Sequence, residues 1–390
     1  MATLLHRARV RSYAALLTAA AVLVAAAHAP TSGAAASAMS APPSLPLRPV
    51  AVGYLPEWRL PGADYVQYAR HLTHLIFFSV EPTPAGGLTA VDRLPSKTDI
   101  AEARAAAKRE GANLKLLVCL GGNGRSAGFS GATARKRTRR KLVSNVAKLV
   151  SDLALDGVDY NWEYPGFAFG AGYADDDTVD REFDALAALV ADTRVVLGEG
   201  AVITAAYYPD GRQERLLAER GVHQHANLLH AMSYDAARGP HSSMQLLEST
   251  LANARRAGLP LAAVTVGLPF YGRGMSTGGW TSYEDIVQRY DPLEPSVDDV
   301  RDETSGEQLS FNGVGTIEKK AQRVLRGGAA GVMIWEAGQD CRVREVVRGG
   351  QVHAMTCPRG EVSSLLAAVA RGLERAAADG KAGASSRDEL

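Results

Sequence analysis

The chain has 390 residues, and 43 Lys and Arg stand against 42 Asp and Glu, which gives a formal net charge of +1 at pH 7. Hydrophobic residues make up 46% of the chain and charged residues 22%, which excludes a disordered or collagen-like protein. Three cysteines are too few for a disulfide scaffold, and the balanced charge excludes a general attraction to nucleic acid or anionic membranes.

The first 49 residues are predicted to be an export segment followed by a linker. Three arginines within the first eleven residues precede an apolar run over residues 13–27, and small residues follow that run. This pattern is typical of a secretory signal peptide, which we place at residues 1–36, with a transit peptide as the alternative. Because the run is short for a membrane span, we expect no stable membrane insertion after signal removal. Residues 37–49 are predicted to be the linker.

From residue 50 onward, eight short apolar runs alternate with helical stretches. Most of the runs are continuously apolar, as in parallel strands that helices cover. Eight βα repeats favour a closed (β/α)8 barrel, or TIM barrel, over residues 50–358, with an open doubly wound sheet as the alternative. The predicted strands are residues 50–54, 75–80, 114–120, 155–160, 202–207, 228–233, 263–268 and 331–335.

The fourth predicted strand carries a row of polar side chains in the sequence Asp156-Gly-Val-Asp-Tyr-Asn-Trp-Glu-Tyr-Pro165. Since side chains of a strand alternate between its faces, Asp159, Asn161 and Glu163 share one face, which would point into the barrel. Glu163 comes last, at the carboxyl end of the strand, where barrel enzymes hold their chemistry. Partial removal from water would raise its pKa and make it a proton donor. The alternative is a buried polar ladder that only organises the barrel.

The remaining segments are an insertion and a C-terminal region. Residues 274–315 interrupt the alternation and are predicted to form a small insertion between strands seven and eight. Residues 359–390 are predicted to hold a helix over residues 363–377 and a tail. The tail ends in Arg387-Asp-Glu-Leu390, which resembles the KDEL retrieval signal. We therefore expect residence in the endoplasmic reticulum lumen, with a retrieval receptor as a partner, and secretion as the second choice.

The three cysteines are assigned from their surroundings. Cys341 and Cys357 could pair in an oxidising lumen. Cys119 lies in an apolar run and is predicted to be a buried free thiol.

The carboxylate strand resembles glycoside hydrolase family 18, the chitinase family, whose signature is D-G-x-D-x-D-x-E. Asp156, Gly157, Asp159 and Glu163 match that signature. Five further segments resemble the family's strand motifs in the same order, so the resemblance spans most of the predicted barrel and implies that fold. These segments are Gly53-Tyr54, Leu120-Gly121-Gly122 (with Cys119 in place of Ser), Met232-Ser-Tyr-Asp235, Gly267-Leu-Pro-Phe-Tyr-Gly272 and Gly331-Val-Met-Ile-Trp335 with Asp340 after it.

The resemblance implies substrate-assisted, retaining cleavage of β-1,4 bonds between N-acetylglucosamine residues in chitin or chitooligosaccharides. Glu163 would protonate the glycosidic oxygen, and the acetamido oxygen of the sugar would attack its own anomeric carbon. Glu163 would then activate water to open the oxazolinium ion, and Tyr234 would donate its hydroxyl to the acetamido oxygen. Asp159 and Asn161 complete the implied catalytic set. Substrate contacts, or plain barrel packing, are expected of Tyr54, Tyr164, Met232, Asp235, Trp335 and Asn123. No cofactor and no metal are expected, and the sequence gives no oligomeric state.

Two residues depart from the family pattern. Asn161 stands where the family has an Asp that holds the acetamido N–H and offsets positive charge. Asn161 can accept the same hydrogen bond but carries no charge, which predicts a slower enzyme with an easier ionisation of Glu163 and a more acidic optimum. Asn123 stands where the family commonly has Trp, which predicts weaker sugar stacking and action on soluble oligosaccharides.

Two other functions remain as alternatives to chitin hydrolysis. An endo-β-N-acetylglucosaminidase acting on the chitobiose core of N-glycans would find its substrate in the endoplasmic reticulum. A chitin-binding lectin that no longer hydrolyses is the second alternative, although such relatives typically lose the Glu. The basic run over residues 135–141 begins a predicted helix and is interpreted as a solvated face rather than a nucleic-acid site.

Overall fold

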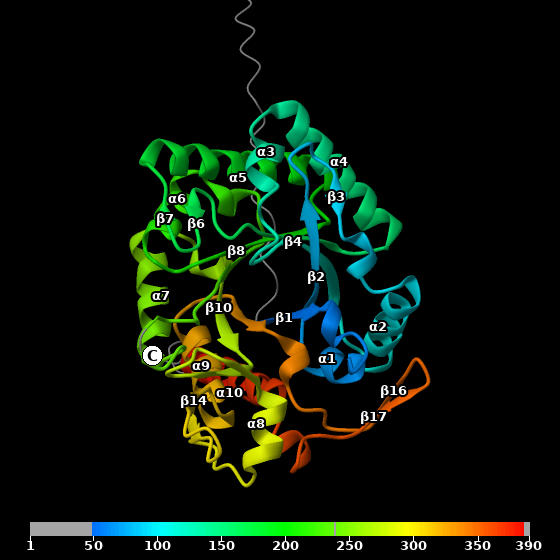
Figure 1. Ribbon diagram of the computed structural model, residues 1–390, viewed down its shortest axis with the longest axis vertical. Helices are drawn as coiled ribbons and strands as arrows, with labels where there is room; N and C mark the ends of the chain where they lie inside the picture. The colour runs from blue at the N-terminus through cyan, green and yellow to red at the C-terminus, as the bar shows by residue number, and fades with distance from the viewer. Residues whose placement is uncertain (1–48, 238, 386–390) are drawn as a thin grey trace, which may run out of the picture. The chain divides into compact units, whose positions relative to one another are not determined.

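Eight parallel strands form a closed barrel (Figure 1). The computed structural model describes residues 49–237 and 239–385, so the predicted signal peptide, all but the last residue of the predicted linker and the final five residues, which include the predicted retrieval signal, lie outside the described residues. Because β1 pairs with both β2 and β15, the sheet closes, which confirms the predicted (β/α)8 barrel. Each of the eight predicted runs overlaps a barrel strand. The barrel strands are β1 (Val50–Pro56), β2 (His74–Pro82), β4 (Lys115–Gly121), β5 (Gly157–Asn161), β8 (Val202–Tyr207), β9 (Leu228–Ala231), β10 (Val264–Pro269) and β15 (Gly331–Trp335).

Helices connect the strands and cover the outer surface of the barrel (Figure 1). Side-chain caps fix several of their starts: Ser96 and Asp99 form a capping box before α2, and Asp175 accepts the Thr178 N–H at α5. The α-helices of the barrel are α1 (Tyr65–His71), α2 (Lys97–Arg109), α3 (Phe129–Thr133), α4 (Lys136–Asp152), α5 (Asp176–Leu197), α6 (Arg212–Glu219), α7 (Met244–Arg256), α9 (Val314–Arg326) and α10 (Leu365–Ser385). None of the helices in the described ranges is long and apolar enough to cross a membrane.

Shorter elements decorate this frame. The short strands are β3 (Leu88–Thr89), which pairs with β2, the hairpin of β6 (Phe167–Ala168) and β7 (Gly172–Tyr173), and the hairpin of β16 (Val346–Arg348) and β17 (Gln351–His353). The 3-10 turns are η1 (Glu57–Arg59), η2 (Val91–Arg93), η3 (Val222–Gln224), η4 (Leu261–Ala263), η5 (Ala337–Gln339) and η6 (Gly360–Val362).

The strand β5 has the two faces that its sequence predicts. Val158 and Tyr160 pack in the apolar layer between the barrel and its helices. The Tyr160 hydroxyl lies 2.7 Å from Thr193 Oγ1 on α5, which places this side chain outside the barrel. Asp159 is fully buried and bonds Tyr54 and Thr204 on other barrel strands, so its face points inward.

The predicted insertion between the seventh and eighth barrel strands folds into a small sheet with one helix. Its strands are ordered β12-β11-β14-β13 and pair antiparallel. Strands of three or four residues are too short for a periodic pattern, which is why the sequence predicted an insertion but not its elements. They are β11 (Tyr271–Gly274), β12 (Trp280–Ser282), α8 (Tyr283–Tyr290), β13 (Asp299–Arg301) and β14 (Gln308–Ser310).

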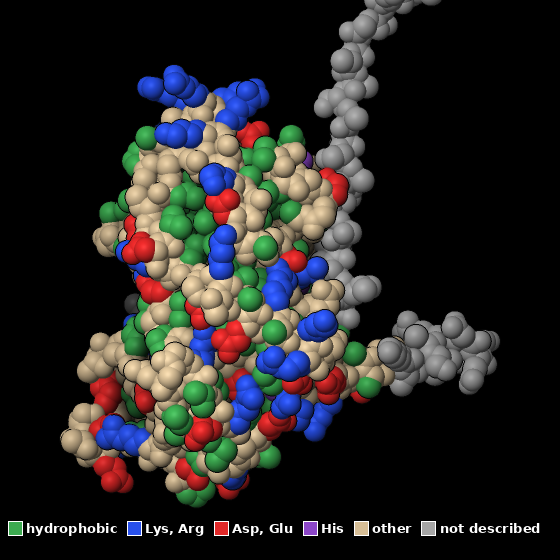
Figure 2. All heavy atoms as spheres, turned by 90° about the vertical axis from the view of Figure 1, so that its right-hand side faces the viewer, with side chains coloured by type: hydrophobic (Ala, Val, Ile, Leu, Met, Phe, Trp, Pro, Cys, Tyr) green, Lys and Arg blue, Asp and Glu red, His purple; other side chains and the backbone are tan. Residues whose placement is uncertain are grey.

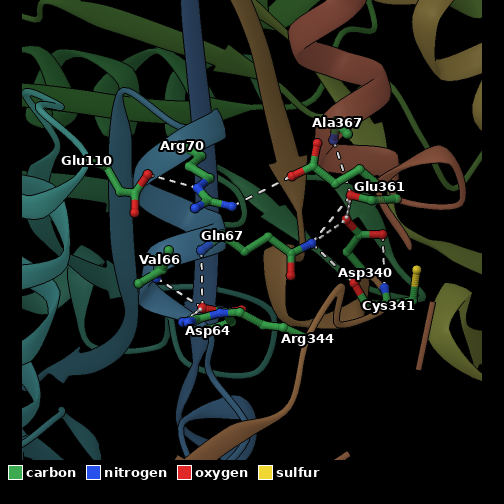
Figure 3. A network of polar contacts seen from close by, with 11 residues as sticks. Asp64, Val66, Gln67, Arg70, Glu110, Asp340, Cys341, Arg344, Glu361 and Ala367 are labelled. Carbon is green, nitrogen blue, oxygen red and sulfur yellow. Dashed lines mark hydrogen bonds and ion pairs between the residues drawn. The ribbon is translucent and has the colours of Figure 1, made fainter. Parts of the chain in front are cut away.

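Asp340, just beyond β15, ties the C-terminal helix to the barrel (Figure 3). Its buried carboxylate accepts hydrogen bonds from the backbone N–H groups of Cys341, Leu365 and Leu366 and from the Ser364 hydroxyl. Gln67 of α1 donates to the same carboxylate, and burial raises the pKa of Asp340 to about 6. This eighth-strand motif residue therefore fixes the start of α10, which runs further than the predicted residues 363–377.

The cysteines have the predicted states. Cys341 and Cys357 form a disulfide that closes a loop over a sequence separation of 16. Cys119 is free and buried on β4.

Candidate active site

A cavity of about 450 Å³ lies at the carboxyl ends of the barrel strands. Nine of the ten predicted site residues line it, although they come from five different strand ends. They are Tyr54, Asn123, Asn161, Glu163, Tyr164, Met232, Tyr234, Asp235 and Trp335. The tenth, Asp159, lies outside the lining, fully buried inside the barrel.

Asp159 is held by hydroxyl groups rather than by cations. The Tyr54 hydroxyl donates to Oδ2 at 2.8 Å, and the Thr204 hydroxyl donates to Oδ1 at 2.6 Å. Burial raises the pKa of Asp159, while these hydrogen bonds and one from Cys119 oppose the rise. Tyr54 therefore reaches both the cavity and the buried carboxylate.

Glu163 sits at the cavity with its carboxyl beside the Asn161 amide. Asn161 Nδ2 donates to Glu163 Oε1 at 3.1 Å. Burial, together with the charge of Asp235, raises the pKa of Glu163 to about 7 against the hydrogen bond from Asn161. Glu163 can therefore hold a proton up to about neutral pH, which suits the proton donor that the sequence predicts.

Asn161 presents an unused acceptor. Within the described part of the chain, its buried Oδ1 has no hydrogen-bond partner. A buried carbonyl without a partner costs free energy, so its retention in a cavity favours a role in ligand binding.

The loop after β4 positions the backbone of Glu163. The Glu163 N–H donates to Ser126 Oγ at 3.0 Å, and Ser126 in turn donates to the carbonyl of Gly122. The backbone of this loop requires glycine at two positions, because Gly121 and Gly122 have positive φ angles of 91° and 108°. A Cβ on Gly122 would lie 2.3 Å from the Phe78 ring. The two glycines of the third-strand motif are therefore explained by the backbone conformation and by the lack of space for a side chain.

Tyr234 and Asp235 leave the barrel just after β9. The predicted run continued to Ser233, but the strand ends at Ala231 because the chain turns into the cavity, where Asp235 has a positive φ of 58°. Asp235 Oδ1 accepts hydrogen bonds from the Tyr271 hydroxyl and from Arg273 Nη1, both at 2.9 Å. Burial would raise the pKa of Asp235, but such donors, His241 included, lower it. Asp235 therefore stays ionised near Glu163.

Aromatic rings form one wall of the cavity. The Trp335 ring lies 5.5 Å from the Tyr54 ring and 4.8 Å from the Phe78 ring, measured between centroids. Two exposed tryptophans, Trp58 and Trp280, also line the cavity, each 52% exposed.

Sequence reasoning missed seven lining residues. Trp58 stands four residues after the first-strand motif and Trp280 lies in the insertion, so tryptophans beside predicted site loops were an available signal. The missed residues are Trp58, Phe78, Arg125, Tyr208, Trp280, Met333 and Gln339.

Comparison with known proteins decides the family. The model of "Glycosyl hydrolases family 18" matches residues 50–340, which is most of the chain. The chain belongs to glycoside hydrolase family 18. Among curated family relatives, Chitinase 1 of Aphanocladium album is 25% identical over 274 residues, which cover 59% of this chain and 63% of that protein. Probable chitinase 2 of Drosophila melanogaster is 27% identical over 189 residues, covering 44% and 37%. The matches thus span between about one third and two thirds of these relatives' own length.

Solved family 18 structures share the fold. A chitinase from Bacteroides thetaiotaomicron superposes with a TM-score of 0.64 at 20% identity, covering 85% of this chain and 97% of that one. An N-acetylglucosaminidase of family 18 from Paenibacillus barengoltzii gives a TM-score of 0.63 at 22% identity, covering 84% and 100%.

The family signature is divided between the cavity and the far end of the barrel. Asp156 accepts the Leu116 N–H at 2.8 Å and pairs with Arg104 at 2.7 Å. It therefore joins β4 and β5, whereas Glu163, two residues beyond the end of β5, lines the cavity. The signature thus contributes both a structural carboxylate and a reactive one.

Basic side chains gather on a surface away from the cavity. Lys and Arg side chains gather at the upper end of the molecule, over α3 and α4 (Figure 2). The basic run includes Arg135, Lys136, Arg137, Arg140 and Lys141, which are exposed on the first turns of α4, as the sequence predicts for a solvated face. Among the described residues, no His, Cys, Asp and Glu side chains group in a way that could hold a metal ion.

Proposed function

We propose that this family 18 protein hydrolyses β-1,4 bonds between N-acetylglucosamine residues of chitooligosaccharides by substrate-assisted, retaining catalysis. The observation that carries this proposal is Glu163, a carboxyl with a pKa near 7 beside the unpartnered Asn161 Oδ1 in an aromatic-walled cavity. A group with this pKa can give up a proton and take it back at neutral pH.

The first step transfers a proton to the leaving group. Asn161 Nδ2 occupies Glu163 Oε1, so the acid proton resides on Oε2 and is donated from there to the glycosidic oxygen. The bond to the anomeric carbon breaks as the acetamido oxygen of the same sugar attacks that carbon. Asn161 Oδ1 accepts the acetamido N–H, which orients the amide oxygen for attack. The products are a shortened chain and an oxazolinium ion.

The second step restores the sugar and the enzyme. Glu163, now a carboxylate, removes a proton from water as the water oxygen bonds the anomeric carbon, and the oxazolinium ring opens. Tyr234 lines the same cavity, and burial raises its pKa well above the usual value, so its hydroxyl remains a donor throughout. We assign it to the acetamido oxygen. The Trp335 ring supplies an apolar surface for the C–H face of the sugar.

The relatives support a chitin-type substrate. The curated relatives named above are chitinases by name, and a solved chitinase domain of Ostrinia furnacalis is described in complex with a penta-N-acetylchitooligosaccharide, (NAG)5. We extend that substrate class to this chain on the geometry of Glu163 and Asn161.

The test is hydrolysis of chitotetraose by the wild-type chain and by Glu163→Gln. The variant is expected to lose about 10²–10⁴-fold in turnover while it still binds the sugar, because only the proton donor is removed. Binding without turnover by the wild type would favour the lectin. Release of glycan from a glycoprotein, with chitotetraose left intact, would favour the endo-β-N-acetylglucosaminidase.

We also propose that the protein acts in the lumen of the endoplasmic reticulum. The Cys341–Cys357 disulfide is of the kind that persists in oxidising compartments. A chain without residues 387–390 is expected to reach the medium, whereas the full chain is expected to stay in the cell. Equal retention of both would contradict a retrieval signal.

A further inference from the structure

A second groove, of about 490 Å³, shares lining residues with the first cavity. Glu163 and Tyr164 line both the first cavity and this groove, and residues of the β6–β7 hairpin line the groove as well. The residue that carries the reactive carboxyl therefore stands between the cavity and the groove. The hairpin lies at the left of Figure 1, next to α6.

The hairpin side of this groove is a chain of aromatic rings. Phe167 lies 5.6 Å from Tyr164, 5.5 Å from Phe169 and 5.1 Å from Tyr173, between ring centroids. On the other side, Tyr164 lies 6.0 Å from Tyr208, which lines the first cavity. The rings thus continue from the first cavity to the tip of the hairpin.

Polar contacts hold the base of the hairpin and leave its tip uncovered. The Gly166 N–H donates to Glu182 Oε2 on α5 at 2.5 Å. The Tyr173 hydroxyl donates to Asp210 at 2.6 Å and accepts from Gln213 at 2.9 Å. Phe169, at the tip, is 56% exposed. A ligand that covered this apolar ring would remove its surface from water and gain free energy.

The chemistry of Glu163 decides what would lie on this surface. The residues assigned to the reacting sugar, Asn161, Tyr234 and Trp335, line only the first cavity. The glycosidic oxygen must meet the Glu163 carboxyl, and the leaving group continues beyond that oxygen. The hairpin groove is a second cavity that Glu163 lines.

We propose that the β6–β7 hairpin binds the leaving-group end of the substrate and that Phe169 determines how strongly a sugar is preferred there. This assignment rests on the proposed function. The ligand is a pyranose ring with an apolar C–H face, which stacks on Phe167 and Phe169. Asn123, at the edge of the first cavity, offers no ring for this purpose.

The test compares two substrates that differ only in the leaving group. Chitotetraose has sugars on both sides of the cleaved bond, whereas chitobiosyl fluoride leaves only fluoride. Phe169→Ala is expected to lower kcat/KM for chitotetraose about three- to tenfold and to leave the fluoride reaction unchanged. Phe169→Trp is expected to retain or raise the chitotetraose rate. Val195→Ala, at an 82% exposed apolar position on α5, is the matched control and should change neither.

The outcomes separate the two proposals. An equal loss of kcat/KM with both substrates would show that Phe169 acts on the fold of the site. An unchanged kcat/KM for chitotetraose would show that the substrate does not cover the Phe169 ring. Either result overturns the assignment. A loss confined to glycan release from a glycoprotein would assign the surface to a peptide and also overturn it. If the wild type turns over neither substrate, the proposed function fails, and the assignment fails with it.

Discussion

The neutral side chain at position 161 makes a sharp prediction for Asn161→Asp. In the wild type, Asn161 Nδ2 donates to Glu163 Oε1 at 3.1 Å, a contact that lowers the pKa of Glu163 against the effect of burial. The aspartate removes this donor and places a second carboxylate beside the first. Two such carboxylates cannot both ionise easily, so one proton is retained to higher pH.

The size of the effect follows from the separation of the charges. At about 4 Å and an effective dielectric constant of about 20, two like charges repel by about 4 kcal/mol. Side-chain movement and solvent relieve part of this repulsion, so we expect the alkaline limb of the pH profile to move upward by about one pH unit or more. In the transition state, a charged contact to the acetamido N–H adds about 1–3 kcal/mol, or roughly ten- to hundred-fold in rate.

The assay is kcat and kcat/KM on chitotetraose between pH 4 and 9 for both proteins. The wild type is expected to lose activity as pH rises through about 7, where Glu163 ionises. Asn161→Asp is expected to be faster and to stay active at higher pH. Asn161→Ala, which offers neither donor nor charge, serves as the control and should be slower than the wild type. An Asn161→Asp protein with unchanged rate and unchanged pH profile would refute the role given to this side chain.

Three further predictions concern stability. Glu163 has a raised pKa in the folded state, so the unfolded chain releases its proton first and wild-type stability falls as pH rises from about 4.5 to about 7. The melting temperature of Glu163→Gln should not show this fall and should be higher than that of the wild type above pH 7. Replacing both Cys341 and Cys357 by Ser should cost about 3 kcal/mol in chemical denaturation, since the loop closed by the disulfide spans 16 positions. Gly122→Ala should lower both the melting temperature and kcat, because its Cβ meets the Phe78 ring; an unchanged kcat would contradict the positioning role of this loop.

The barrel could be predicted because its signal repeats along the chain. Each apolar run has the length and continuity of a parallel strand, and eight of them leave little choice of fold. The insertion lacked such a signal: β13 and β14 have three residues each, and their pairing joins segments that no local pattern connects. The sequence singled out Asp340 through the eighth-strand motif but did not predict its anchoring role, because its partners lie in α1 and α10.

The site was predictable where residues alternate along one strand and not where loops converge. Asp159 and Glu163 share a face because of the strand period, and the structure keeps both on the inner side. Trp58 and Trp280 reach the same cavity from segments more than two hundred residues apart, which only the closed barrel brings together. The aromatic hairpin after Glu163 was overlooked for a different reason, since its two strands have two residues each.

Asn161 also changes how protons can move in this site. A carboxylate at that position could accept and return a proton, whereas an amide only donates through Nδ2 and accepts through Oδ1. The next carboxylate along the strand, Asp159, is occupied by the hydroxyls of Tyr54 and Thr204. Glu163 therefore has to complete the cycle with its own proton, returning to the acid form by the proton it takes from water. Its pKa near 7 suits both halves of that cycle, and we expect a single ionisation to govern the alkaline limb of the wild-type profile.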